Sequence, residues 1–261
     1  MRRFLNVGGK TLHAELRPGD GGRPIVFINS LGSDLRIWDA VLPGLPAEAP
    51  VLRHDKCGHG LSSGGTDSIG GFAQDLADAM DQVAMAGALV VGLSIGGLIA
   101  LQLTQDRPDL VGGLVLSNTS YRIGTDEMWQ ARMDDLDALG LPAMSAGVIE
   151  RWLSPGFRAA HPVATEGWRM MLARTPQPGY RAACAAIRDA DLSAVLPRLS
   201  CPVLCIAGSE DVTTPPAVVA DLAERIPGAA MVELEGVGHL PCLEMPDRVA
   251  ELVAGMHGRL S

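Results

Sequence analysis

The chain has 261 residues, of which 47% are apolar and 20% charged, so it can bury a substantial core and is not a disordered segment. Its formal net charge is −9 and two of its 21 basic residues are lysines, which argues against a surface for nucleic acid or anionic membrane. A small anionic substrate is not excluded, because a pocket can carry local positive charge. The five cysteines show no Cys-x-x-Cys pair and no zinc-ligand spacing, so we expect neither a disulfide framework nor a metal site.

The N-terminus carries two basic residues, Arg2 and Arg3, but no apolar stretch follows them, so no signal peptide is predicted. No run approaches the ~18 consecutive apolar residues that a transmembrane helix needs. We therefore expect a cytoplasmic protein that binds neither nucleic acid nor membrane. The sequence makes no prediction of the oligomeric state.

Short apolar runs bounded by glycine, proline or asparagine follow one another along the chain. They are nearly continuous rather than alternating, as expected of parallel strands that are buried on both faces. Helical patterns lie between them, and strands that alternate with helices predict a doubly wound α/β sheet. The predicted strands are 25–28, 51–53, 88–91, 114–116, 203–207 and 231–234, and the predicted helices are 72–85, 95–105, 216–225 and 247–256.

The segment from about residue 121 to 199 interrupts this alternation. It shows no convincing strand, but it has helical patterns and holds nine arginines and three of the four tryptophans. The strand–helix rhythm resumes at Cys201. A helical block inserted between two strands of one sheet predicts a helical lid at 121–199 on an α/β core formed by 1–120 and 200–261. Ordinary helices that extend the core are the alternative.

A Gly-x-Ser-x-Gly motif centred on Ser94 lies between a predicted apolar strand and an apolar helix. The motif alone is a weak signal, but this context is typical of a nucleophile elbow, where strand and helix approach so closely that side chains at Gly92 and Gly96 would collide. The turn places the serine hydroxyl at a helix N-terminus, which favours developing negative charge. Ser94 is therefore the predicted nucleophile, and a structural glycine turn with an incidental serine is the alternative.

A serine nucleophile needs a base, and among the six histidines His239 is the one that follows a late predicted strand. The glycine beside it lets a loop bring the imidazole across the sheet edge. Asp211 follows the strand at 203–207 and is the carboxylate predicted to orient this imidazole, with Glu210 as the competing acid. The chain order Ser94, Asp211, His239 is the order of α/β-hydrolases and differs from both serine-protease orders.

Acyl transfer also needs hydrogen-bond donors for the oxyanion. We expect one to be the backbone N–H of Ile95, directly after the nucleophile, and the other the backbone N–H of Leu31, in the loop after the first buried strand. The Gly58-His59-Gly60 segment is interpreted as a turn whose histidine hydrogen-bonds locally, without a catalytic role.

Together these motifs resemble the α/β-hydrolase superfamily over nearly the whole core. Within that superfamily the chain is most similar to 3-oxoadipate enol-lactonases, which act in the ortho-cleavage pathway of aromatic catabolism. Two residues depart from the family pattern: Cys57 stands where relatives often carry arginine, and Ile95 stands where methionine is common. The segments that carry the closer resemblance are 31–38, 116–119 and 180–192.

The resemblance implies that the three predicted catalytic residues open a lactone through an acyl-enzyme, which water then hydrolyses to 3-oxoadipate without a metal or organic cofactor. It also implies a substrate carboxylate, for which Arg132 is the expected partner, with Trp129 and Trp152 as apolar walls. Another serine hydrolase of the same fold, such as a carboxylesterase, a carbon–carbon-bond hydrolase or a perhydrolase, is one rival. A hydrolase-fold ligand-binding protein that has kept the triad incidentally is the other.

Overall fold

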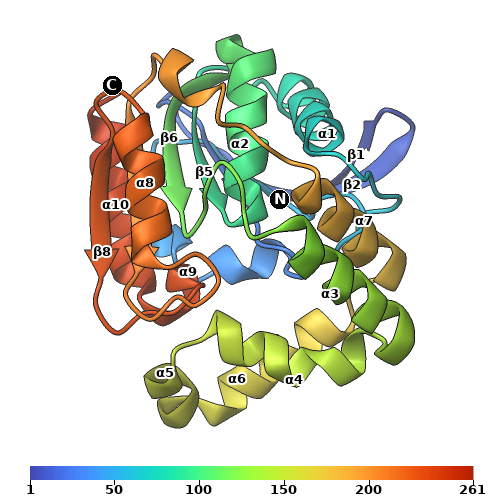
Figure 1. Cartoon of the computed structure of the whole chain (residues 1–261). Coiled ribbons are helices and arrows are strands. Elements are labelled where there is room, and N and C mark those ends of the chain that lie inside the picture. The colour runs from blue at the N-terminus through green and yellow to red at the C-terminus, as the bar shows by residue number, and fades with distance from the viewer. Residues whose placement is uncertain (261) are drawn as a thin grey trace.

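The computed structural model describes residues 1–260 and contains one eight-stranded sheet with helices packed around it (Figure 1). The strand order is β1-β2-β4-β3-β5-β6-β7-β8. The first two strands run antiparallel to each other and the second antiparallel to β4, whereas all later neighbours are parallel. The strands are β1 (Arg2–Val7), β2 (Lys10–Arg17), β3 (Ile25–Ile28), β4 (Val51–His54), β5 (Ala88–Leu93), β6 (Val111–Ser117), β7 (Val203–Gly208) and β8 (Ala230–Leu234).

This sheet confirms the predicted α/β class, and each of the six predicted strands is present as β3 to β8. The hairpin of β1 and β2 was not predicted. Its turn consists of Gly8 and Gly9, which have φ values of 54° and 82°. Two such glycines suit a two-residue hairpin turn, because that turn requires positive φ at both positions.

The four helices predicted around the strands are present as α1, α2, α8 and α10, with shifted ends in three of them. α1 begins before the predicted residue 72 because the Ser68 hydroxyl accepts a hydrogen bond from the Gly71 N–H at 3.1 Å and caps the helix. Within residues 1–260 no helix has both the length and the apolarity needed to cross a membrane. The helices are α1 (Ile69–Gln82), α2 (Ile95–Asp106), α3 (Asp126–Leu139), α4 (Leu141–Trp152), α5 (Pro155–Ala160), α6 (Pro162–Ala173), α7 (Gln177–Arg188), α8 (Pro216–Arg225), α9 (Pro241–Glu244) and α10 (Pro246–Gly258).

Helices α3 to α7 fill the segment between β6 and β7. In this block α3 packs against α7 and α4 packs against α6. Figure 1 shows α3 to α6 gathered beyond the end of the sheet toward which the arrow of β6 points. The carboxyl end of a parallel sheet is where ligands bind in open α/β folds, so the block stands over the place where a site is expected. Its action as a lid stays a prediction.

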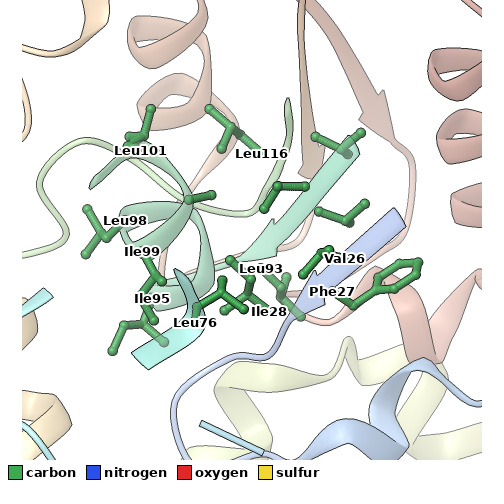
Figure 2. Packing of buried hydrophobic residues seen from close by; sticks show 14 of the residues in the cluster. Val26, Phe27, Ile28, Leu76, Leu93, Ile95, Leu98, Ile99, Leu101 and Leu116 are labelled. Atoms are coloured by element: carbon green, nitrogen blue, oxygen red, sulfur yellow. The ribbon is translucent and has the colours of Figure 1, made fainter. Parts of the chain in front are cut away.

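The helix after the Ser94 motif is buried along its first two turns. α2 lies between α1 and strands β3, β5 and β6, and Figure 2 shows its side chains Ile95, Leu98 and Ile99 in one apolar cluster with Ile28 of β3 and Leu93 of β5. A helical stretch that is covered on every side can be apolar all round, as residues 95–101 are. This packing fixes the start of α2, and with it the position of Ser94, against the sheet.

The close approach of strand and helix leads to a first prediction. A Cβ atom on Gly96 would lie 2.4 Å from the carbonyl oxygen of Ile28, so we expect Gly96→Ala to lower the free energy of unfolding by about 2 kcal/mol, measured by urea denaturation. In α10, a Cβ on Gly255 would meet no atom within 4 Å. Gly255→Ala should therefore leave stability unchanged or raise it by ~0.5–1 kcal/mol. Equal stability of the two variants would contradict the close approach.

Candidate active site

Ser94 lies at a strained turn between β5 and α2. Its φ is 58° and its ψ is −120°, a backbone conformation that costs a non-glycine residue on the order of 1–3 kcal/mol. Hydrogen bonds hold the turn: the Ser94 N–H donates to the Ser117 carbonyl at 3.0 Å, and the Ser94 carbonyl accepts from Thr119 Oγ1 at 2.7 Å. Among the described residues Ser94 Oγ makes no hydrogen bond, so its hydroxyl is uncommitted at the wall of a cavity.

His239 lines the same cavity as Ser94 and is held by a buried carboxylate. Its Nδ1 lies 2.7 Å from Oδ2 of Asp211, and both residues are buried. The backbone N–H of His239 also donates to the Trp152 carbonyl at 2.9 Å, which ties the loop to the end of α4. Because Nδ1 is engaged by the carboxylate, Nε2 is the nitrogen available to exchange a proton with the cavity.

Four further donors converge on the Asp211 carboxylate. Oδ1 accepts the backbone N–H groups of Thr213 at 2.7 Å and Thr214 at 3.1 Å, and Oδ2 accepts Thr214 Oγ1 at 2.8 Å and Asn118 Nδ2 at 2.9 Å. Burial alone would raise the pKa of Asp211, but His239, Asn118 and Thr214 outweigh it and lower the pKa below its usual value. The carboxylate is therefore ionised at neutral pH.

Glu210, the competing acid, is exposed to solvent, and the structure brings Asp211 rather than Glu210 to the imidazole. Asn118 was not predicted as a site residue. It directly follows β6 with a φ of 46°, is fully buried, and its Nδ2 also donates to the Gly238 carbonyl at 3.2 Å. Asparagine tolerates this left-handed backbone better than most residues, so Asn118 links the acid and the histidine loop from the end of a third strand.

The two expected oxyanion donors have free backbone N–H groups. Within the described part of the chain, neither the Leu31 N–H nor the Ile95 N–H donates a hydrogen bond. Ile95 is the first residue of α2, where N–H groups lack partners inside the helix. Leu31 lines the cavity together with Ser94 and His239. The arrangement can therefore offer an attacking hydroxyl, a base and two N–H donors to one carbonyl group.

The cavity has a volume of about 350 Å³ and is lined by all three residues predicted to contact the substrate, Trp129, Arg132 and Trp152. This size is at the lower end of the range for small-molecule pockets, roughly 300–1,000 Å³. The Arg132 side chain is fixed by the buried hydroxyl of Tyr180, which accepts from Nε at 2.9 Å and from Nη2. Its guanidinium carbon also lies 5.8 Å from the centre of the Trp129 ring.

A second arginine of the cavity, Arg151, was not predicted. Burial and the neighbouring Arg132 lower its pKa from the ordinary value. Along residues 1–260 neither arginine forms an ion pair with a carboxylate, although Asp135 also lines the cavity. The cavity wall therefore carries two neighbouring cations that repel each other and have no bonded carboxylate among the described residues.

A comparison with protein-family models matches residues 25–252 to the alpha/beta hydrolase family. The chain belongs to this family. A 3-oxoadipate enol-lactonase of Acinetobacter baylyi is 30% identical to this hydrolase over 97% of the chain and 95% of that protein. A pimeloyl-acyl-carrier-protein methyl ester esterase of Neisseria meningitidis is 31% identical over 89% of the chain and 92% of that protein. The crystal structure of an enol-lactonase from Burkholderia xenovorans superposes with a TM-score of 0.93 at 32% identity, covering 97% of this chain and 99% of that one.

The turn predicted at Gly58-His59-Gly60 is present. His59 of the hydrolase is completely buried, and neither of its ring nitrogens has a hydrogen-bond partner of ordinary geometry in residues 1–260. Burial, together with the nearby Lys56, holds its pKa well below the usual value, so the ring stays neutral. His59 does not line the cavity that Ser94 and His239 share.

Proposed function

We propose that this hydrolase opens the ring of 3-oxoadipate enol-lactone through an acyl-enzyme on Ser94. The observation that carries the proposal is a strained serine facing the same cavity as a histidine whose Nδ1 is bonded to a buried carboxylate. The two enol-lactonase relatives from Acinetobacter and Burkholderia, at 30% and 32% identity over nearly the full length, support the substrate.

The geometry supports the following sequence of steps. Ser94 Oγ attacks the lactone carbonyl while Nε2 of His239 takes the hydroxyl proton, and Asp211 stabilises the resulting imidazolium. The N–H groups of Leu31 and Ile95 bind the oxyanion. The ring C–O bond then breaks, the departing enolate oxygen takes the proton from His239, and the enol formed ketonises. Water that gives a proton to His239 attacks the acyl group and releases the diacid, which restores the serine.

The block at 121–199 acts, in this proposal, as the lid that selects the substrate. It supplies the two arginines and two tryptophans of the cavity wall. The lactone carries a free carboxylate, for which Arg132 and Arg151 are the partners, while Trp129 and Trp152 are about 5% exposed and offer apolar surface to the ring. Tyr180 holds Arg132 through Nε and Nη2, which leaves Nη1 for the carboxylate.

We expect Arg132→Met to raise KM for the enol-lactone about 10- to 100-fold, because hydrogen bonds to charged groups contribute roughly 1.5–3 kcal/mol. KM for a neutral aryl ester should stay unchanged. Steady-state kinetics on both substrates test this. Arg181→Met is the matched control, since Arg181 lies in the same block but pairs with Asp137 on the surface at 3.0 Å. Equal effects of Arg132→Met on the two substrates would argue against a carboxylate partner.

Loss of the ultraviolet absorbance of the enol-lactone on addition of the purified protein tests the proposed reaction itself. Turnover well above that of simple aryl esters is expected. The second candidate is a carboxylesterase, favoured by the 31% identity to the methyl ester esterase of Neisseria meningitidis. Hydrolysis of methyl or aryl esters with no turnover of the enol-lactone would replace the lactonase by this candidate, while the roles of Ser94, His239 and Asp211 would remain.

A further inference from the structure

Lys56 is a buried amine that the proposed reaction has not used. It follows β4, is 2% exposed, and ranks among the largest fully buried side chains. Its Nζ donates to the carbonyl oxygen of Ser30 at 2.6 Å and to that of Ser33 at 3.4 Å. Burying an ammonium group is costly unless it is bonded, and here both of its acceptors belong to the loop that presents Leu31.

The bond to Ser30 fixes the direction of the Leu31 N–H. The Ser30 carbonyl and the Leu31 N–H belong to the same peptide unit, and this unit is trans, so the two groups point in opposite directions. The same carbonyl oxygen also accepts Ser33 Oγ at 2.8 Å and the Ser33 N–H at 3.3 Å. Three donors therefore hold the carbonyl on the side of Lys56, and the Leu31 N–H is directed to the opposite side.

We propose that Lys56 is a positioning residue for the oxyanion hole, which holds the Ser30–Leu31 peptide so that its N–H meets the developing oxyanion. The inference rests on the proposed acyl transfer at Ser94. A donor that is already fixed needs no reorganisation when charge develops, which is how such sites lower a barrier. A cation on the carbonyl also polarises the peptide, so its N–H becomes a stronger donor.

The groups around Lys56 set its charge. Burial lowers its pKa to about 7, against the opposing effect of the carboxylates of Asp55 and Asp34. Lys56 in turn helps to keep the buried imidazoles of His54 and His59 neutral. The ammonium form is present below the pKa and is lost as pH rises through it.

Lys56→Met removes the amine and keeps the length of the side chain. Lys10→Met is the matched control, because Lys10, the other lysine of the chain, bonds to Asp75 at 2.6 Å and does not line the cavity. Active sites are first counted by stoichiometric reaction of Ser94 with a fluorophosphonate, and kcat and KM are then measured per counted site on a neutral aryl ester. We expect kcat per site to fall about 10- to 100-fold in Lys56→Met with KM nearly unchanged, and no change in Lys10→Met.

Fewer active sites with an undiminished kcat per site would show that Lys56 only stabilises the fold, and would overturn the proposal. If Lys56→Met cannot be recovered folded, the same measurement is made on Ser33→Ala. The Ser33 hydroxyl donates to the same Ser30 carbonyl oxygen, so its removal also loosens the Ser30–Leu31 peptide. A loss of roughly 3- to 10-fold in kcat per site supports the proposal, and an unchanged value overturns it. Ser94→Ala separates the two claims: full turnover there would refute the acyl transfer at Ser94 on which the role of Lys56 rests, whereas loss of turnover there together with an undiminished kcat per site in Lys56→Met would refute the role of Lys56 alone.

Discussion

Replacing Ser94 by alanine is expected to lower kcat/KM for ester or lactone hydrolysis at least ~10³-fold. The variant keeps the cavity, the oxyanion donors and the His239–Asp211 pair, but no oxygen remains to form the acyl-enzyme. Initial rates on the enol-lactone and on an aryl ester measure the loss. A burst of product at high enzyme concentration should disappear together with the steady-state rate.

The control for this change is Ser120→Ala, which removes the hydroxyl of a buried serine that does not line the cavity. Its rate should match that of the unmodified protein.

The strained backbone at Ser94 adds a second comparison, because glycine adopts a φ of 58° without penalty and alanine does not. We expect Ser94→Gly to be more stable than Ser94→Ala by about 1 kcal/mol in urea unfolding. Hydrolysis at the full rate in either variant would refute Ser94 as nucleophile.

The parallel strands and the order of the three site residues could be predicted because their signals are local. Buried parallel strands are short continuous apolar runs, and each was found within a few residues of its observed ends. The elbow combines two glycines with an apolar strand and helix, and a Cβ on Gly92 would indeed lie 2.3 Å from the Gly96 carbonyl oxygen. The residues that form the elbow are neighbours in the sequence, so the elbow could be predicted from them alone.

The β1–β2 hairpin shows a signal that was present but overlooked. In β2 the apolar residues Leu12, Ala14 and Leu16 alternate with more polar ones and are buried, while their neighbours Thr11 and Glu15 are less so. This alternation is typical of an antiparallel strand with one face on the core. A strand of this kind contains no continuous apolar run, which was the signal that predicted the other strands.

The residues that hold the site residues in place could not be predicted from the sequence, for a different reason. Asn118 and Lys56 act through partners far along the chain: Asn118 lies 93 residues from Asp211, and Lys56 lies 26 residues from Ser30. A polar residue after a strand is consistent with many partners, and only the sheet order selects one. Arg151 was missed because nine arginines in the block look alike until the packing of α3, α4 and α7 places two of them on the cavity wall.

Asp211→Asn is expected to lower kcat roughly 10³- to 10⁴-fold with little change in volume. The N–H groups of Thr213 and Thr214 both donate to Oδ1, so the amide oxygen of asparagine will occupy that position and its NH₂ will face His239. An NH₂ group donates to Nδ1 and leaves the ring proton on Nε2, where it blocks acceptance of the Ser94 proton. The pH–rate profile and kcat on an aryl ester measure the effect, and a loss below tenfold would refute the role of Asp211.

Glu210→Gln is the matched control, since the neighbouring carboxylate is exposed and should be dispensable. Stability gives an independent readout. The folded pKa of Asp211 lies below its unfolded value of about 3.9, so its ionised form stabilises the fold above that pH, and this contribution is lost as pH falls through the folded pKa. Asp211→Asn cannot titrate. Its deficit in free energy of unfolding should therefore be largest at neutral pH and shrink in acid, whereas a deficit independent of pH would mean that the buried carboxylate is not held ionised by its donors.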